Sequence, residues 1–154
     1  MTASAPTLWD TIASEANAES ELWGAALRPE GERELVPVFS TLTEERFAVG
    51  LETIYEGYLL HYGKPRVFQA VDRDTRILLG DYLYAHGLVR IADLGEVDAV
   101  GALAELLSLC AHLRAEQLPG DGEAWAATVS LLGTGAPEPF ARERALALHA
   151  ERVE

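Results

Sequence analysis

Apolar residues along the chain recur with the spacing of one helix face, and the strict alternation typical of half-buried strands is nearly absent. The pattern predicts helices over about residues 7–27, 43–62, 72–94, 97–116, 123–132 and 140–152. Residues 32–42, interrupted by Pro37, are predicted to form a short helix or an irregular connection. We therefore expect an all-α fold, a bundle of about five to seven helices.

Helix ends are marked by residues that commonly cap them. Thr43, and either Asp72 or Asp74, can accept hydrogen bonds from the first backbone N–H groups of the helices that follow. Gly63 and Gly95 are typical of helix C-termini. Since the connections are short, neighbouring helices are expected to run antiparallel.

The helix expected over residues 97–116 is apolar nearly all round. Its apolar residues are Val97, Val100, Leu103, Leu106, Leu107, Leu109, Cys110 and Leu113. A helix with so wide an apolar face is typical of the centre of a bundle or of a subunit interface. We expect one of these two places for it.

The chain has 154 residues, the usual length of one domain. We expect a single helical domain over residues 1–154, with flexible ends at about 1–6 and 150–154. The only cysteine, Cys110, excludes an internal disulfide and fits a reducing compartment. No signal-peptide pattern precedes Trp9, and no apolar run approaches the roughly 20 residues that span a bilayer. A cytoplasmic location is therefore expected.

The charge balance argues against some classes of partner. The formal net charge is −13, from 25 acidic and 12 basic residues. Such a field repels phosphate backbones and anionic lipid heads. We expect neither nucleic acid nor a membrane surface as a partner.

Two similar phrases place an acid five residues before a histidine, Glu56 before His61 and Asp81 before His86. If the two helices pack together, these four side chains could hold a divalent metal. A spacing of five turns the two side chains about 140° apart on a helix, whereas helical metal sites use a spacing of three. Hydrogen-bonded polar residues at the bundle surface are the competing interpretation.

Asp81 is predicted to lean toward apolar packing, because its helix neighbours at three and four residues are Ile77, Leu78, Tyr84 and Ala85. A buried carboxylate must be paired or hydrogen-bonded. Its partner is expected to be a tyrosine or a backbone group, or else Asp81 belongs to a polar cavity.

Basic residues cluster in and after the loop at Gly63: Lys64, Arg66, Arg73 and Arg76. Basic side chains beside a loop can bind a phosphate or diphosphate, although Asp72 and Asp74 weaken the field here. Tyr58 and Tyr82 would line such a ligand site, with core packing as the competing interpretation.

Residues 52–111 resemble the trans-polyprenyl diphosphate synthase family. The similar segments are residues 51–55, 59–61, 63–67, 77–85 and 94–96. In that family a helix with a similar leucine-histidine end carries the first aspartate-rich motif. A Gly-Lys-Pro loop follows, and then a helix that opens with Gly-Asp. The resemblance implies a fold like the first half of a polyprenyl synthase, and a homodimer or heterodimer.

The chain differs from the family in the residues that the family uses for catalysis. After His61 the family has an Asp-Asp-x-x-Asp motif that holds magnesium, but here Tyr62 and Gly63 follow directly. The paired arginine is missing, and the second aspartate-rich motif belongs to a region beyond residue 154. Without metal ligands nothing neutralises the leaving diphosphate. Of the residue types that contact the diphosphate in the family, only Lys64 lies near its expected place in this sequence.

The resemblance therefore implies a non-catalytic protein without a cofactor, a regulatory or small subunit that partners a catalytic polyprenyl synthase chain in isoprenoid synthesis. Two alternatives stay open. One is a helical protein that binds a metal or a small hydrophobic ligand near His61 and His86, and the other is a structural or assembly protein.

Overall fold

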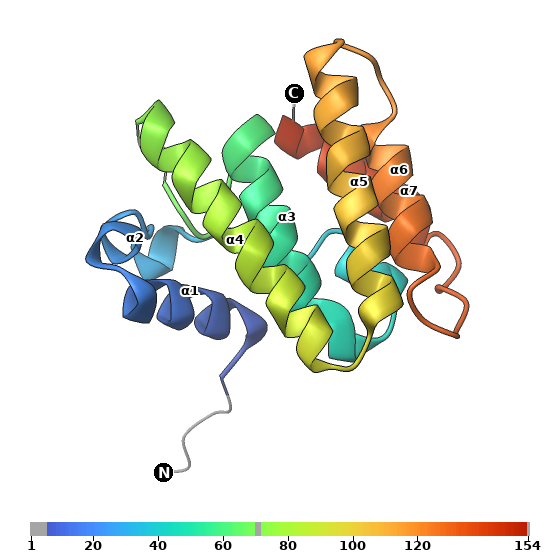
Figure 1. Cartoon of the computed structure of the whole chain (residues 1–154), viewed down its shortest axis with the longest axis horizontal. Helices are drawn as coiled ribbons and strands as arrows, with labels where there is room; N and C mark the ends of the chain where they lie inside the picture. Colours follow the sequence, from blue (N-terminus) through green and yellow to red (C-terminus); the bar gives the residue numbers. More distant parts are fainter. Residues whose placement is uncertain (1–5, 70–71, 154) are drawn as a thin grey trace.

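The computed structural model describes residues 6–69 and 72–153, and within these it is helical, without strands (Figure 1). The α-helices are α1 (Leu8–Glu19), α2 (Glu21–Ala25), α3 (Ala48–Tyr62), α4 (Arg73–Asp93), α5 (Val97–Ala115), α6 (Asp121–Ser130) and α7 (Ala141–Val153). Three 3-10 turns, η1 (Glu30–Glu32), η2 (Ser40–Leu42) and η3 (Glu45–Phe47), lie between α2 and α3. The predicted all-α fold is confirmed.

Helix α3 forms the centre of the fold. Eleven of its 15 residues are buried, including Glu52 and Glu56. Figure 1 shows α3 beside α4, with α1 and α2 on one side and α5, α6 and α7 on the other. The core has two parts, because α3 packs against α1 and the loop after Tyr62 on one side and against η2, α6 and α7 on the other.

The predicted central position of the helix over residues 97–116 is wrong. The buried residues of α5 are only Ala99, Leu103, Leu106 and Cys110, whereas Val97 is 74% exposed. The apolar pattern of the sequence does not indicate α3 as the central helix, because α3 carries two glutamates. The other expectation for this helix, a place in a subunit interface, stays a prediction.

Glycines let α3 and α4 approach at backbone distance. A Cβ atom on Gly57 would lie 2.8 Å from the carbonyl oxygen of Gly80. A Cβ on Gly87 would lie 2.8 Å from the carbonyl oxygen of Gly50 and 2.5 Å from Cγ1 of Ile54. The close crossing explains why glycine occurs twice inside each helix, although glycine there costs about 0.5–1 kcal/mol relative to alanine.

The observed helix ends agree in part with the predicted caps. Asp72 accepts a hydrogen bond from the backbone N–H of Thr75 at 2.9 Å and begins α4, and Gly63 ends α3. The predicted first helix divides at Ser20, which is extended and caps α2. Thr43 does not cap the start of α3 as predicted, because η3 intervenes before α3 begins at Ala48; it ends η2 instead.

The irregular connection predicted over residues 32–42 is confirmed, with η2 at its end. Of the ends that were expected to be flexible, residues 1–5 and 154 lie outside the described residues. Residues 150–153 form the last turn of α7. None of the helices described is both long and apolar enough to cross a membrane.

The variant Gly87→Ala should lower the free energy of unfolding by about 1–3 kcal/mol, because the added methyl group must displace α3 backbone or Ile54. The matched control is Gly101→Ala in α5, where a Cβ meets nothing within 4 Å. This control should raise stability by up to about 1 kcal/mol. Urea denaturation measures both, and equal effects would contradict the close crossing.

Candidate functional site

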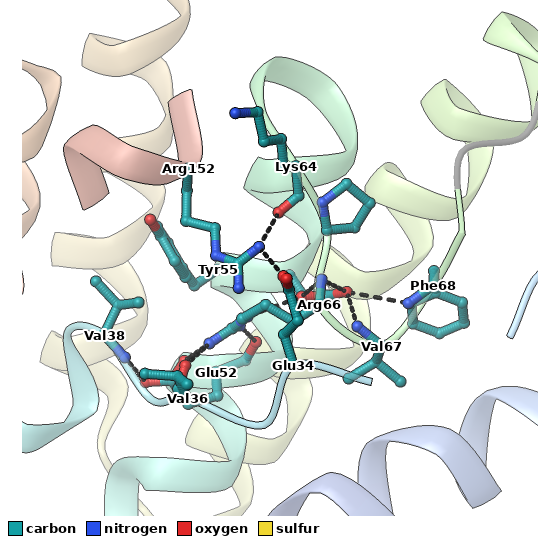
Figure 2. Close-up of polar contacts among 12 residues, drawn as sticks. Glu34, Val36, Val38, Glu52, Tyr55, Lys64, Arg66, Val67, Phe68 and Arg152 are labelled. Atoms are coloured by element: carbon teal, nitrogen blue, oxygen red, sulfur yellow. Dashed lines mark hydrogen bonds and ion pairs between the residues drawn. The ribbon is translucent and has the colours of Figure 1, made fainter. Parts of the chain in front are cut away.

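Arg66 is completely buried and pairs with two glutamates of α3, Glu52 and Glu56. Figure 2 shows Arg66 beside Glu52. Its Nη1 atom is 2.6 Å from Oε1 of Glu52, and its Nε atom is 3.0 Å from Oε1 of Glu56. The two glutamates are four residues apart, so they lie on the same face of α3. Their side chains are 1% and 0% exposed. We call these three residues the Arg66 clamp.

The remaining carboxylate oxygens of the clamp bind backbone. Oε2 of Glu56 accepts hydrogen bonds from the backbone N–H groups of Arg66 and Val67 at 2.8 and 2.7 Å. Oε2 of Glu52 accepts from the N–H groups of Val38 and Ser40 at 3.2 and 3.1 Å. The clamp therefore fastens two irregular segments, residues 36–40 and 66–68, to the central helix.

Four of the five N–H donors of the Arg66 guanidinium group bind acceptors within the protein, and its complete burial keeps an outside ligand from reaching the group. Its other hydrogen bonds reach the carbonyl oxygens of Val36 and Glu52, and the group lies 4.7 Å from the ring centre of Trp9 and 5.0 Å from that of Tyr55. Burial alone would lower the pKa of Arg66, but the two adjacent carboxylates raise it above its ordinary value. Arg66 is therefore a permanent cation of the core.

The predicted phosphate site is not assembled. Arg76 donates hydrogen bonds to the carbonyl oxygens of Leu60 and Gly63, where it caps the end of α3. The amine of Lys64 points away from the clamp in Figure 2, and its backbone N–H donates to the carbonyl oxygen of Arg152. Of the four basic residues that cluster in the sequence, Arg66 and Arg76 thus bind groups within the fold, whereas Lys64 and Arg73 are exposed.

The four residues of the predicted metal site, Glu56, His61, Asp81 and His86, lie at three separate positions in the structure. Nε2 of His61 lies 3.1 Å from Oδ1 of Asp81, so this pair does meet. His86 instead pairs with Glu15 of α1 at 2.6 Å, and Glu56 belongs to the Arg66 clamp. Within the described residues, no three His, Cys, Asp or Glu side chains are placed to share a metal ion.

The predicted packing of Asp81 is wrong. Its side chain is 64% exposed, and its neighbours Ile77 and Leu78 are 39% and 56% exposed. The reason is that α4 turns its glycine face toward α3 and leaves this apolar stripe at the surface. Tyr82, the other predicted ligand residue on α4, stacks on Trp23 at 5.9 Å.

A second polar cluster surrounds Asp121, and sequence reasoning missed it. Oδ2 of Asp121 accepts hydrogen bonds from Tyr58 and Arg114, each at 2.6 Å, and lies 3.1 Å from Nε2 of His149. Nδ1 of His149 lies 2.7 Å from the hydroxyl of Tyr55. The residues come from α3, α5, α6 and α7, so no local motif in the sequence could reveal them.

This cluster ties helices together. Burial opposes ionisation of Asp121, but hydrogen bonds from its three partners more than offset it and hold the pKa below its usual range. Burial and the bond to Asp121 raise the pKa of Tyr58. His149 is 4% exposed and packs against the aromatic rings of Phe39 and Tyr55. Such packing leaves a substrate no approach to the imidazole.

A hollow with a volume of about 610 Å³ lies between α5 and α6, and none of its lining residues belongs to either polar cluster. Its apolar walls come from Ala99, Ala102, Leu106, Leu109, Leu131 and Leu132. Acidic residues of α5 and of the turn before it line one side. We call this hollow the α5–α6 groove.

Comparisons with protein-family models, curated proteins and solved structures found no match to the chain. The resemblance to polyprenyl synthases therefore rests on the sequence segments in residues 52–111.

The variant Asp121→Asn should be about 2 kcal/mol less stable than the wild type at pH 7, because it loses three charge-assisted contacts. Since the folded-state pKa of Asp121 is depressed, its stabilisation is complete above the ordinary carboxyl pKa and is lost as pH falls below it. The stability difference should therefore begin to shrink below about pH 5 and keep shrinking below pH 3, towards the depressed folded-state pKa. Urea denaturation over this range checks it, and a difference that is constant with pH would refute the assignment.

Proposed function

We propose that this protein is a non-catalytic, polyprenyl-synthase-like regulatory or small subunit of an isoprenoid-synthesising complex. It binds a catalytic polyprenyl synthase chain through its surface and performs no prenyl transfer itself. The single cysteine, Cys110, fits a cytoplasmic setting for such a complex.

The observation that carries the proposal is the burial of Arg66. Arg66 directly follows Gly63, Lys64 and Pro65, the segment that resembles the Gly-Lys-Pro loop of the polyprenyl synthases. Here it is 0% exposed and bound to Glu52 and Glu56, while Arg76 caps α3. Diphosphate binding needs free cationic donors. Both arginines are committed to the fold and only Lys64 and Arg73 are exposed, which supports a non-catalytic role.

A binding role is supported by the apolar side chains left at the surface of α5 and α6. Leu109 is 46% exposed and Leu131 is 83% exposed, and both line the α5–α6 groove. Exposed apolar groups gathered in a hollow are typical of binding surfaces. They give the protein a means of association that requires no catalytic residue.

The alternative with an observation behind it is a small hydrophobic ligand in the α5–α6 groove. The groove volume of about 610 Å³ lies in the range of ligand pockets. Leu109 and Leu131 of its lining are exposed and Glu96, Asp98 and Glu105 make it acidic, which favours a protein segment over a fully enclosed small molecule. The metal alternative keeps only the His61–Asp81 pair, and one pair is too few ligands for a protein metal site.

Native mass spectrometry of the protein purified from its own source tests the proposal. We expect a stoichiometric complex with a chain that carries both aspartate-rich motifs. Added to that chain, the purified protein should change the length distribution of the prenyl products or the stability of the catalytic chain, and alone it should turn over no prenyl diphosphate. A homo-oligomer without a second chain, or a stoichiometric metal in elemental analysis of the same sample, would refute the proposal.

A further inference from the structure

The α5–α6 groove combines an apolar floor with one charged edge. Leu106 and Ala99 form part of the floor and are buried, whereas Leu109 and Leu131 stand at the opening. Its lining on α5 runs from Asp98 to Leu109, about three helical turns at 1.5 Å per residue. The groove thus has the length over which a helix can lay an apolar stripe.

The acidic residues along the charged edge of the groove are regularly spaced on α5. Asp98 and Glu105 are seven residues apart on α5, nearly two full turns, so they lie on the same side about 10 Å apart. Glu96 at the same edge already pairs with Arg46. Asp98 and Glu105 are exposed, and no basic side chain among the described residues pairs with either of them.

The acidic edge of the α5–α6 groove disfavours a second copy of this chain as the bound partner and favours a basic segment. In a two-fold dimer the same patch faces itself, so a second copy would set Asp98 and Glu105 against their own equivalents. The net charge of −13 on each chain adds to that repulsion. A basic segment instead neutralises both carboxylates at the edge while its apolar residues cover the leucines.

We propose that the α5–α6 groove binds an amphipathic helix of a protein partner, with two basic residues seven positions apart along one edge of its apolar stripe. The basic residues face Asp98 and Glu105, and apolar residues at the i, i+3, i+4 and i+7 spacing contact Leu109 and Leu131. The inference rests on the proposed function, for which it names the docking surface and the chemistry of the partner.

A pair of synthetic helical peptides tests the groove with the intact protein. One peptide carries leucines at i, i+3, i+4 and i+7 and lysines at two edge positions seven apart, and the other has glutamates at those two positions. The lysine peptide should bind at least about tenfold more tightly in fluorescence anisotropy. The double variant Asp98→Lys/Glu105→Lys should reverse this preference. Leu131→Ser should weaken the lysine peptide about tenfold, through lost apolar contact.

The matched control is Glu143→Lys/Glu151→Lys, which makes the same change of net charge at two exposed positions of α7. It should leave the preference for the lysine peptide in place. The proposal is overturned if wild-type protein binds both peptides alike, or if the α7 control reverses the preference as fully as the groove variant does. A dimer of the protein alone that Leu131→Ser dissociates would overturn it too, because a second copy would then occupy the groove.

The experiments can refute the proposed subunit role and the proposed docking surface independently of each other. If the catalytic chain co-purifies equally well with wild-type protein and with Leu131→Ser, the subunit role stands and the groove is not its docking surface. If no catalytic chain co-purifies but the peptide preference reverses as described, the groove binds a basic helix and the isoprenoid role fails.

Discussion

The fold depends on one buried ionic interaction, the clamp of Arg66 by Glu52 and Glu56. Two carboxylates inside the central helix would be prohibitively costly without a partner, since each isolated buried charge costs several kcal/mol. Arg66 compensates both, and the remaining carboxylate oxygens bind backbone N–H groups of residues 36–40 and 66–68. The clamp thus lets α3 be buried nearly all round and holds both irregular segments of the fold against it.

The same interaction shapes the functional interpretation. A diphosphate-binding loop needs cations that are free to meet a ligand, and here Arg66 is part of the core and Arg76 of a helix cap. Under the proposed function, association with a partner would use the surface, where leucines of α5 and α6 line an acidic-edged groove. A structural clamp at Arg66 is what that proposal expects of a protein that associates with a catalyst and does not act as one.

Periodicity and capping residues were enough to predict the all-α fold, the end of α3 at Gly63 and a cap of α4 at Asp72 or Asp74, of which Asp72 is the one observed. They could not predict which helix is central, because α3 carries glutamates whose burial depends on Arg66, ten residues or more away. Of the candidate site, only the His61–Asp81 contact was anticipated. The cluster at Asp121 joins four helices, so its residues share no local pattern.

The most direct measurement is the free energy of unfolding of Arg66→Met beside that of Arg142→Met. Each arginine pairs with glutamate, but Arg66 is 0% exposed, whereas Arg142 and its partner Glu123 are 48% and 63% exposed. Removing Arg66 leaves two buried carboxylates uncompensated and should cost about 3–5 kcal/mol or prevent folding, while the surface change should cost less than about 1 kcal/mol. Similar small losses in both variants would contradict the account, since Arg66 would then not hold the fold together.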